Sequence, residues 1–419
     1  MVRRVVTKGF ALLERLVLLC AYQYFARIKR RGMERDISWV VGPLEIASMI
    51  RQLSGVIPRS YSVSFGTSAF YQNVHYDRSL PGSLNRKTGP IGTLRRALYG
   101  PLALAELSTR ARGFIYVGPT GFLRFTQDER AYELKFLKNH GIRIGFYWCG
   151  SDIRSPTLMQ QLETQTGSPN IFSYIGMISP AMLSAAHESV VKRRAELSDL
   201  YADIVFDFPM DQKNYITKHT EPFYYFMSDE QFDGVEEKFA TIDRIVVSHA
   251  ASSPIIKGTQ LVRSAIARLR AEGYDFDYVE MLNFSNEQVL SQLRRSHIAL
   301  NQFYGFTPAV FGCEALAARC AVMQSADGIS EPRIPPHASD AWVVTRHYEV
   351  YQNLKTLLDD PELIRRQADR GQEWARKYCS VAETGQILNQ LLDSVLDGSY
   401  DAAERAKDPD SAYVLQERS

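Results

Sequence analysis

The sequence has little cysteine, no excess of either charge and no uninterrupted long apolar run. Its 5 cysteines form no CxxC pair and no Cys/His cluster, so neither a disulfide framework nor a structural zinc site is expected. Lys+Arg 49 against Asp+Glu 47 leaves a net charge of +2, which disfavours a nucleic-acid partner. With 45% hydrophobic and 23% charged residues, the chain is neither disordered nor collagen-like. The cysteine usage predicts a reducing, cytoplasmic compartment.

Residues 1–35 form a basic N-terminal segment. They contain nine Lys or Arg and two Glu, a formal charge of +7, which leaves −5 for the other residues. The run from Gly9 to Ile28 is mostly apolar, but Glu14 and Arg15 interrupt it and no small-residue cleavage site follows. This pattern disfavours a spanning helix and a signal peptide. Two interpretations stay open: an amphipathic helix that contacts the inner membrane face through residues 1–32, or a helix packed on the neighbouring domain.

From residue 36 to residue 225, short β-rich runs alternate with helical ones. Strands are predicted at 37–42, 60–65, 113–118, 143–150 and 203–208. Helices are predicted between them, including one that Pro43 opens and others over 128–141 and 179–202. This βα order predicts a doubly wound parallel sheet.

A second series of the same kind follows a polar linker, residues 226–243. Its strands are predicted at 244–249, 276–282, 297–303, 321–324 and 341–345, and this domain ends after a last helical region at residue 396. Residues 397–419 are predicted to be a loose polar tail. The two βα series predict an α/β protein with two Rossmann-like domains. The chain length agrees with this, because a typical domain has about 150 residues.

A candidate anion site lies at the start of a helix in the second series. Lys257, Gly258 and Thr259 follow the strand at 244–249, and no GxGxxG motif follows the first strand of either domain, which argues against an ordinary NAD enzyme. Backbone N–H groups at a helix start can hold a diphosphate, with Lys257 as its counter-charge. The alternative is a solvated helix cap without a ligand.

Glu314 is a candidate sugar-binding residue. It lies inside an otherwise apolar helix that Thr307 and Pro308 begin. A carboxylate in such a helix needs partners, and the two hydroxyls of a ribose or hexose suit its two oxygens. The alternative is an ion pair with a nearby arginine such as Arg319.

The segment SHAASSPIIKGTQLVRSAIARLRAEGYDFDYVEMLNFSNEQVLSQLRRSHIALNQFYGFTPAVFGCEALAARCAVM resembles the donor-binding domain of GT-B glycosyltransferases of the retaining family 4. The upstream pieces WVVGPLEIASMI, SYSVSF and FYWCGSDIR resemble the acceptor domain of a bacterial envelope-polysaccharide branch of that family. The resemblance covers residues from about 36 to about 396. It implies the GT-B fold, in which two Rossmann-like domains face each other across a cleft.

The resemblance also assigns roles to residues of the second domain. It implies that Lys257 contacts the donor diphosphate and that Glu314, the second glutamate of an E-x7-E motif, holds the nucleotide ribose. The predicted donor-binding residues are Gly42 of the first domain and these residues of the second: His249, Lys257, Gly258, Thr259, Phe306, Thr307 and Glu314. Three positions depart from the family pattern, since Phe306 replaces the first glutamate, Ser252 a common arginine and Cys149 an acceptor-domain histidine.

The GSDIR segment ends a first-domain strand and predicts an acceptor site. Asp152 and Arg154 are expected to face the cleft there, and Asp152 can orient an acceptor hydroxyl or serve as a helix N-cap. Gly118 and Gly150 end strands beside it and let the backbone approach a substrate closely. Asp152, Lys257 and Glu314 are the predicted catalytic residues. Because the sequence has no plausibly placed DxD motif, no metal is expected.

The implied function is transfer of a hexose from a nucleoside diphosphate sugar to a hydroxyl of a glycan or lipid-linked acceptor, with retention at the anomeric carbon. The nucleotide sugar is a substrate, and no cofactor is expected. The departures at Phe306 and Ser252 leave an alternative, a catalytically impaired GT-B module that binds a nucleotide or a partner protein. The predicted location is cytoplasmic, with peripheral contact to the inner membrane face through residues 1–32.

Overall fold

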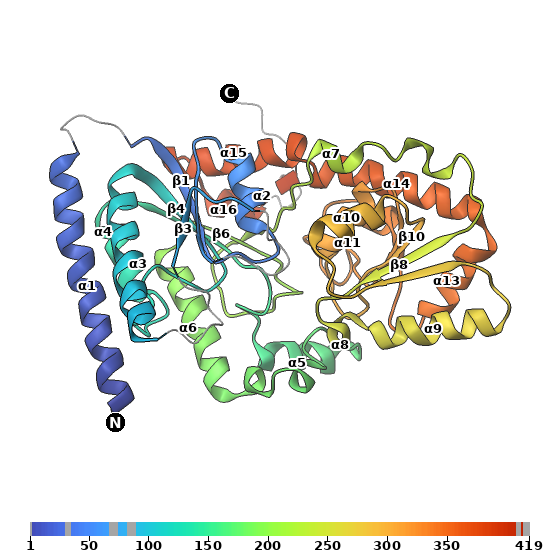
Figure 1. Ribbon diagram of the computed structural model, residues 1–419, viewed down its shortest axis with the longest axis horizontal. Coiled ribbons are helices and arrows are strands. Elements are labelled where there is room, and N and C mark those ends of the chain that lie inside the picture. The colour runs from blue at the N-terminus through green and yellow to red at the C-terminus, as the bar shows by residue number, and fades with distance from the viewer. Residues whose placement is uncertain (1, 30–34, 67–73, 82–88, 408–411, 414–419) are drawn as a thin grey trace.

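The computed structural model describes residues 2–29, 35–66, 74–81, 89–407 and 412–413. Two α/β lobes lie side by side, and helix α1 runs along the outer edge of the first lobe (Figure 1). The first lobe holds a seven-stranded sheet of order β3-β2-β1-β4-β5-β6-β7, and the second holds a five-stranded sheet of order β12-β11-β10-β8-β9. Every strand pairing in these sheets is parallel.

The first sheet contains all five predicted strands of its domain. Its strands are β1 (Ile37–Pro43), β2 (Tyr61–Phe65), β3 (Arg78–Leu80), β4 (Ala111–Val117), β5 (Arg143–Tyr147), β6 (Ile204–Asp207) and β7 (Glu221–Pro222). Its helices are α2 (Met49–Val56), α3 (Pro90–Arg110), α4 (Ala131–Asn139), α5 (Pro156–Thr166) and α6 (Ala185–Tyr201). The prediction that Pro43 opens a helix is wrong, because Pro43 pairs with Val117 at the end of β1.

Alternating residues of the central strands enter two different cores. Trp39 and Val41 of β1 pack on the side of α2, whereas Val40 packs on the opposite side with Phe114 and Tyr116 of β4. Both faces of the sheet are therefore apolar and covered, as a parallel sheet with crossover helices requires.

The second sheet is also covered on both faces. Its strands are β8 (Val246–Ala250), β9 (Asp277–Met281), β10 (Ile298–Leu300), β11 (Ala321–Gln324) and β12 (Val343–Val344). Its helices are α8 (Pro254–Lys257), α9 (Thr259–Ala271), α10 (Asn286–Leu293), α11 (Ala309–Ala317), α12 (Ala338–Ala341), α13 (Val350–Asp359) and α14 (Pro361–Cys379). The strand predicted at 341–345 is shorter than expected, because Ala341 ends α12.

The linker and the C-terminal region contain more structure than the sequence predicted. Residues 226–243 include α7 (Asp229–Phe232) and a short 3-10 helix, Glu236–Phe239. Helix α15 (Val381–Asp397) returns to the first lobe, where Asn389 Nδ2 donates to the carbonyl oxygen of Val56 at 3.0 Å. The tail is not loose in its described part, because α16 (Ala402–Lys407) is anchored by a buried ion pair of 2.8 Å between Arg405 and Glu221.

Helix α1 (Val2–Ile28) packs along α3 of the first lobe. Glu14 is fully buried, and its carboxylate accepts the backbone N–H groups of Arg124 and Phe125 at 2.7 and 2.9 Å. Burial raises the pKa of Glu14 to about 7. The packed-helix interpretation therefore holds for this face of α1.

The opposite face of α1 is apolar and open. Leu12, Leu16 and Leu19 are 60%, 53% and 46% exposed. The helix is more uniformly apolar than expected, and the stretch Thr7–Ile28 is long and apolar enough to span a membrane by length and composition alone. A core helix or a signal sequence meets the same criterion. The basic residues Arg30 and Arg31 of the predicted contact segment lie outside the described residues.

Candidate functional site

The carboxyl ends of the two sheets face the interdomain cleft, and the strand order reverses direction within each sheet. In the first sheet β2 and β4 flank β1, and in the second sheet β9 and β10 flank β8. Loops that follow strands at such a switch point form the usual binding crevice of an open parallel sheet. Gly42 and His249 lie near the carboxyl ends of β1 and β8, and the other predicted site residues follow β4, β5, β8 or β10 in loops or helices.

Lys257 ends the one-turn helix α8, and a single residue separates it from the long helix α9. Gly258 then adopts a left-handed conformation, φ +79°, and Thr259 starts α9. The Nζ atom of Lys257 donates to Oε1 of Gln302 at 2.5 Å, and Gln302 Nε2 donates to the carbonyl oxygen of Thr307 at 2.6 Å. Burial lowers the pKa of Lys257 to about 8, although the nearby carboxylate of Asp211 acts in the opposite direction. Lys257 and Thr307 thus belong to one hydrogen-bonded chain.

His249 lies beneath this loop and is fully buried. Its Nδ1 is 2.7 Å from the carbonyl oxygen of Leu300, and its Nε2 is 2.8 Å from Oγ1 of Thr259. Both ring nitrogens are therefore engaged within the protein. His249 therefore supports the start of α9 from below and has no free ring nitrogen for direct contact with a sugar donor.

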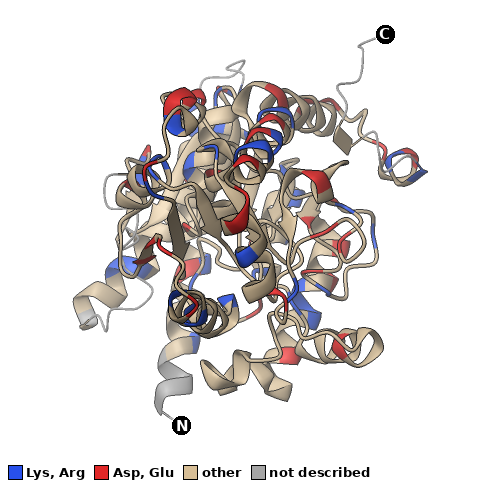
Figure 2. Ribbon diagram, turned by 90° about the vertical axis from the view of Figure 1, so that its right-hand side faces the viewer, with Lys and Arg blue, Asp and Glu red and all other residues tan. Residues whose placement is uncertain are grey.

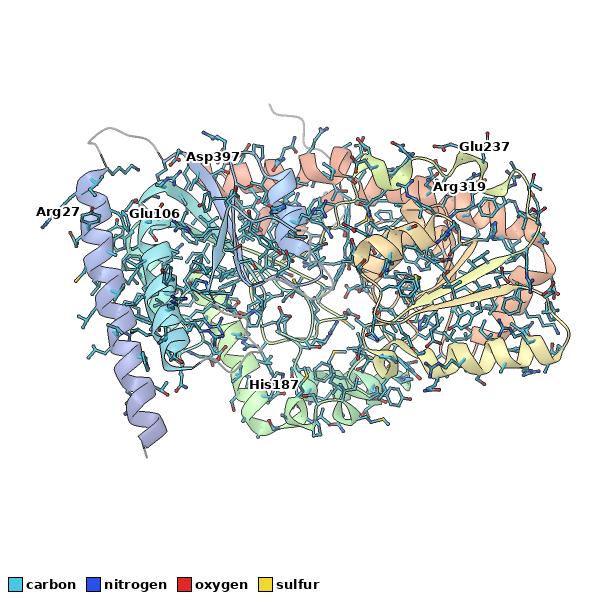
Figure 3. All side chains as sticks on the ribbon, viewed as in Figure 1. Arg27, Glu106, His187, Glu237, Arg319 and Asp397 are labelled. Carbon is cyan, nitrogen blue, oxygen red and sulfur yellow. The ribbon has the colours of Figure 1, made fainter. Side chains whose placement is uncertain are left out.

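Glu314 is buried in α11, with 6% of its surface exposed. Its Oε1 accepts from Nδ2 of Asn286 at 2.8 Å, and burial raises its pKa to about 7. Arg319 instead pairs with Asp369 at 2.6 Å; it lies toward the outer side of the second lobe, in the same region as Glu237 (Figure 3). The structural alternative, an ion pair between Glu314 and Arg319, is therefore wrong, because the turn after α11 carries Arg319 away from Glu314.

Asp152 organises the GSDIR loop after β5. Its carboxylate accepts the backbone N–H groups of Cys149 and Gly150 at 3.1 and 2.7 Å, and burial raises its pKa. Asp152 is not a helix N-cap, because Ser155 caps α5 by accepting from the N–H of Leu158.

Three predicted glycines have close-packed surroundings, Gly42 within β1 and Gly118 and Gly150 in the turns after β4 and β5. A Cβ on Gly118 (φ +68°) would lie 3.4 Å from Oδ2 of Asp152, and one on Gly150 (φ +146°) would lie 3.1 Å from Nη1 of Arg154. A Cβ on Gly42 would lie 2.1 Å from the carbonyl oxygen of Val63. Gly42 is therefore required for the approach of β2 to β1, whereas Gly118 and Gly150 border the Asp152 loop.

Arg154 and Phe306 meet at a residue that the sequence did not single out, Asp211. The guanidinium of Arg154 forms a buried ion pair with the Asp211 carboxylate and also donates to its carbonyl oxygen at 2.5 Å. The N–H of Phe306 donates to Oδ1 of the same carboxylate at 2.8 Å. Asp211 therefore joins the GSDIR loop of the first lobe to the loop after β10 in the second lobe.

Glu331 forms a second link across the cleft. Its Oε2 accepts the N–H groups of Met210 and Asp211 at 2.8 and 2.9 Å, and burial raises its pKa to about 7. A cavity of about 290 Å³ opens beside these links and is lined by residues of both lobes, among them Leu162, Met210 and Phe306. Neither Asp211 nor Glu331 belongs to a motif, and their roles depend on partners that lie 57 to 121 residues away in the chain.

Glu45 is a further residue that the sequence reasoning missed. It follows β1, and its carboxylate accepts from the hydroxyl of Tyr76 at 3.0 Å and from the N–H of Ile50 at 3.3 Å. Burial raises the pKa of Glu45 to about 7. Burial also raises the pKa of the Cys149 thiol, and the charges of Asp152 and Glu45 add to that effect. Glu45 therefore lies close to the Asp152 loop, on the acceptor side predicted from the sequence.

Charged side chains of both signs are interspersed over the molecule (Figure 2). Within the described residues, no group of three or more His, Cys, Asp or Glu side chains could hold a metal ion. The cysteines in that part of the chain are free thiols.

No protein-family model and no curated protein sequence matches this chain. Several solved glycosyltransferase structures do match it over most of its length. Sucrose-phosphate synthase from Thermosynechococcus elongatus has a TM-score of 0.56 and 10% identity, covering 86% of this chain and 100% of its own. HepE from Anabaena, in complex with UDP and glucose, has a TM-score of 0.53 and 12% identity, covering 87% and 100%.

An α-glucosyltransferase in complex with UDP-glucose and DNA containing an abasic site has a TM-score of 0.51 and 10% identity, covering 85% of this chain and 98% of its own. These neighbours are GT-B glycosyltransferases. The chain has the GT-B fold. The expectation of two Rossmann-like domains facing a cleft is thereby confirmed.

Proposed function

We propose that this chain is a retaining glycosyltransferase that moves a hexose from a nucleoside diphosphate sugar to a hydroxyl of a glycan or lipid-linked acceptor. The observation that carries the proposal is the convergence of Lys257, Arg154 and Asp211 at the cleft of a GT-B fold. The solved neighbours that bind UDP or UDP-glucose support a nucleotide-sugar donor.

In the proposed reaction the donor diphosphate lies beside Lys257 and the start of α9. The bond between the anomeric carbon and the diphosphate oxygen breaks, and a bond from that carbon to the acceptor oxygen forms. The acceptor proton passes to the departing diphosphate. The ammonium of Lys257 and the positive end of α9 stabilise the charge that develops on the leaving group, which is the largest contribution expected of such a site.

Glu314 is proposed to accept the ribose hydroxyls of the donor. Its hydrogen bond from Asn286 fixes the carboxyl group, and its position in α11 follows the loop that contains Phe306 and Thr307. Asp152 and Glu45 lie on the opposite side of the cleft, where an acceptor hydroxyl would approach. We propose that no metal ion takes part, since the diphosphate charge is balanced by Lys257 and the helix terminus.

The direct test is turnover of a donor panel. Purified protein should hydrolyse or transfer one of a set of UDP-, GDP- and TDP-sugars, and the corresponding nucleotide should raise its melting temperature. Lys257→Ala should lose both effects, whereas Lys355→Ala, on the outer face of the second lobe, should retain them. Absence of nucleotide binding in the wild-type protein would reject the proposal.

Phe306 favours a second candidate, a GT-B module that binds a nucleotide without transferring the sugar. Phe306 presents no carboxylate to a donor sugar, and its N–H is already bonded to Asp211. Nucleotide binding with no turnover of any donor, with or without a glycan acceptor, would identify the chain as such a module.

We further propose that α1 holds the protein on the inner membrane face. Its open face presents Leu12, Leu16 and Leu19, while Glu14 fixes the other face to the first lobe. Shallow burial of an apolar face beside basic residues gives reversible binding that high salt weakens. A truncation would also remove the contacts of Glu14, so substitutions on the open face are the cleaner test.

The triple variant L12Q/L16Q/L19Q should sediment less with phosphatidylglycerol vesicles than the wild-type protein. The control variant L183Q/L200Q/I329Q replaces three apolar residues that are 53%, 66% and 89% exposed elsewhere. Equal sedimentation of both variants and the wild type would reject membrane contact through α1.

A further inference from the structure

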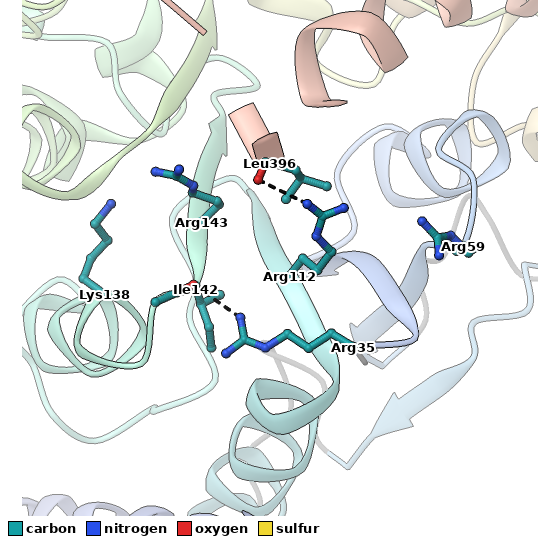
Figure 4. A pocket seen from close by; sticks show the side chains of 8 residues that line it. Arg35, Arg59, Arg112, Lys138, Ile142, Arg143 and Leu396 are labelled. Atoms are coloured by element: carbon teal, nitrogen blue, oxygen red, sulfur yellow. Dashed lines mark hydrogen bonds between the residues drawn. The ribbon is translucent and has the colours of Figure 1, made fainter. Parts of the chain in front are cut away.

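A strongly basic pocket lies on the first lobe, away from the interdomain cleft. Its volume is about 870 Å³, and Figure 4 shows several cationic side chains gathered around it. The basic lining residues are Arg35, Arg59, Arg112, Lys138 and Arg143. No residue of the proposed transfer site lines this pocket.

The topology of the sheet explains why these charges meet. Arg59 precedes β2, Arg35 precedes β1, Arg112 is the second residue of β4 and Arg143 is the first residue of β5. These four strands are consecutive neighbours in the sheet and run in parallel. Their amino ends therefore form one edge, and each end contributes an arginine to it. This edge is opposite to the carboxyl edge that faces the cleft.

The contacts of the arginines within the fold leave the pocket cationic. The Arg35 guanidinium donates to the carbonyl oxygens of His140 and Gly141 at 2.9 and 3.3 Å. Arg112 donates to the carbonyl oxygen of Leu396 at 3.2 Å. Carbonyl oxygens carry no net charge, and each guanidinium has five N–H donors, so neither charge is neutralised by these bonds.

Asp203 offsets part of the charge on the other side of the pocket. Its Oδ1 accepts from Nζ of Lys138 at 2.9 Å and from Nη1 of Arg143 at 3.1 Å. Because Lys138 and Arg143 share this one carboxylate, the three groups together keep a net positive charge. Burial and the nearby charge of Arg112 lower the pKa of Arg35, in agreement with cations held close together. Like charges in a half-enclosed pocket repel, and a bound anion relieves that repulsion.

We propose that this pocket binds a phosphate-bearing anion with at least two negative charges. Planar guanidinium groups donate two parallel hydrogen bonds to phosphate oxygens, and a pocket with several of them favours phosphate over a simple halide. The volume accommodates more than one phosphate group. The site is separate from the donor site and does not depend on the proposed transferase activity.

Two sources of this chemistry are compatible with the surroundings of the pocket. The pocket lies at the C-terminal end of α1, where Lys29 donates to the carbonyl oxygen of Thr109. Burial and the charge of Arg35 lower the pKa of Lys29. The phosphate can therefore belong to a lipid headgroup beside α1 or to a soluble polyphosphate. Both offer the same oxygens to the arginines.

Calorimetry with tripolyphosphate tests the soluble form, and sedimentation with phosphatidylglycerol vesicles tests the lipid form. The double variant R59Q/R112Q should weaken the interaction at least tenfold in one of the two assays. The single variant R59Q, at an exposed side chain, should weaken binding of tripolyphosphate or vesicles severalfold. It replaces the double variant in both assays if the double variant does not fold. The control R193Q/R295Q removes the same charge from exposed positions on α6 and after α10 and should bind like the wild type.

Lys257→Ala separates this site from the proposed donor site. Tripolyphosphate binding that persists in Lys257→Ala and is lost in R59Q/R112Q supports the pocket with a soluble ligand. Vesicle binding lost in R59Q/R112Q but kept in the control supports the pocket with a lipid headgroup. Loss in Lys257→Ala alone, equal loss in the control, or no binding in either assay would overturn the proposal, and none of these results bears on sugar transfer itself.

Discussion

Replacement of Lys257 by alanine tests the proposed diphosphate contact most directly. The ammonium donates to Gln302 in the free protein and lies near the carboxylate of Asp211. A charge-assisted hydrogen bond to a phosphate contributes about 1.5–3 kcal/mol, so UDP should bind roughly 10- to 150-fold more weakly to Lys257→Ala. The loss of the Gln302 contact should cost about 1 kcal/mol of unfolding free energy, which leaves the variant folded.

The lowered pKa of Lys257 adds a pH dependence. With a pKa of about 8, the side chain is about 90% charged at pH 7 and about 10% charged at pH 9. Nucleotide affinity of the wild-type protein should therefore fall by up to about tenfold between these pH values if the charged form alone contacts the diphosphate. Lys257→Ala should show a much flatter profile, because it has lost the titrating group.

Isothermal titration calorimetry of UDP at pH 7 and pH 9 measures both effects, with Lys355→Ala as the matched control. Equal affinity of Lys257→Ala and wild type at pH 7, in a protein with unchanged circular dichroism, would remove Lys257 from the donor site. A pH profile that is the same in both proteins would refute the assignment of the titration to this lysine.

Three further predictions concern other parts of the molecule. Glu314→Gln keeps an acceptor for Asn286, so sugar transfer should fall at least tenfold while the melting temperature changes little; unchanged donor binding per folded molecule would favour a structural role. Gly150→Val places a Cβ about 3.1 Å from Nη1 of Arg154 at a φ of +146°, so transfer should fall strongly in a radiochemical assay, and wild-type transfer would show that the turn lies outside the active cleft. Glu14→Ala leaves two half-buried N–H groups without their acceptor, so urea denaturation should show a loss of about 2–4 kcal/mol of unfolding free energy; a change below about 0.5 kcal/mol would mean that α1 is not docked through this residue.

The amino-acid sequence was sufficient to predict the double series of strands and helices. The strands predicted at 113–118 and 321–324 correspond closely to β4 and β11, because short β-branched and aromatic runs between turn residues are a local signal. The sequence also placed Glu314 inside an apolar helix and Lys257 in the segment between the first strand and the first long helix of the second series, where the structure has α11 and α8. The elements could be predicted because hydrophobic periodicity and chain order together determine which edge of a parallel sheet a loop joins; the roles of the two residues stay predictions.

Local patterns were less informative about short segments whose structure depends on tertiary pairing. β3 and β7 are three and two residues long, too short for a recognisable period. Pro43 resembled a helix start, but its pairing with Val117 extends β1 instead. The tail resembled a disordered segment by composition, yet Arg405 finds a buried partner in Glu221.

The tertiary structure alone decided which charged groups meet. Glu14 interrupts an apolar run in the sequence, and the backbone N–H groups that donate to its carboxylate lie 110 and 111 residues away in the chain. Asp211 and Glu331 belong to no motif, because their chemistry comes from partners that the fold brings across the cleft. The basic pocket likewise arises from strand order: its arginines are scattered along the sequence, and parallel pairing places the amino ends of β2, β1, β4 and β5 at one edge. Electrostatic sites depend on distance in space, which a local sequence pattern does not encode.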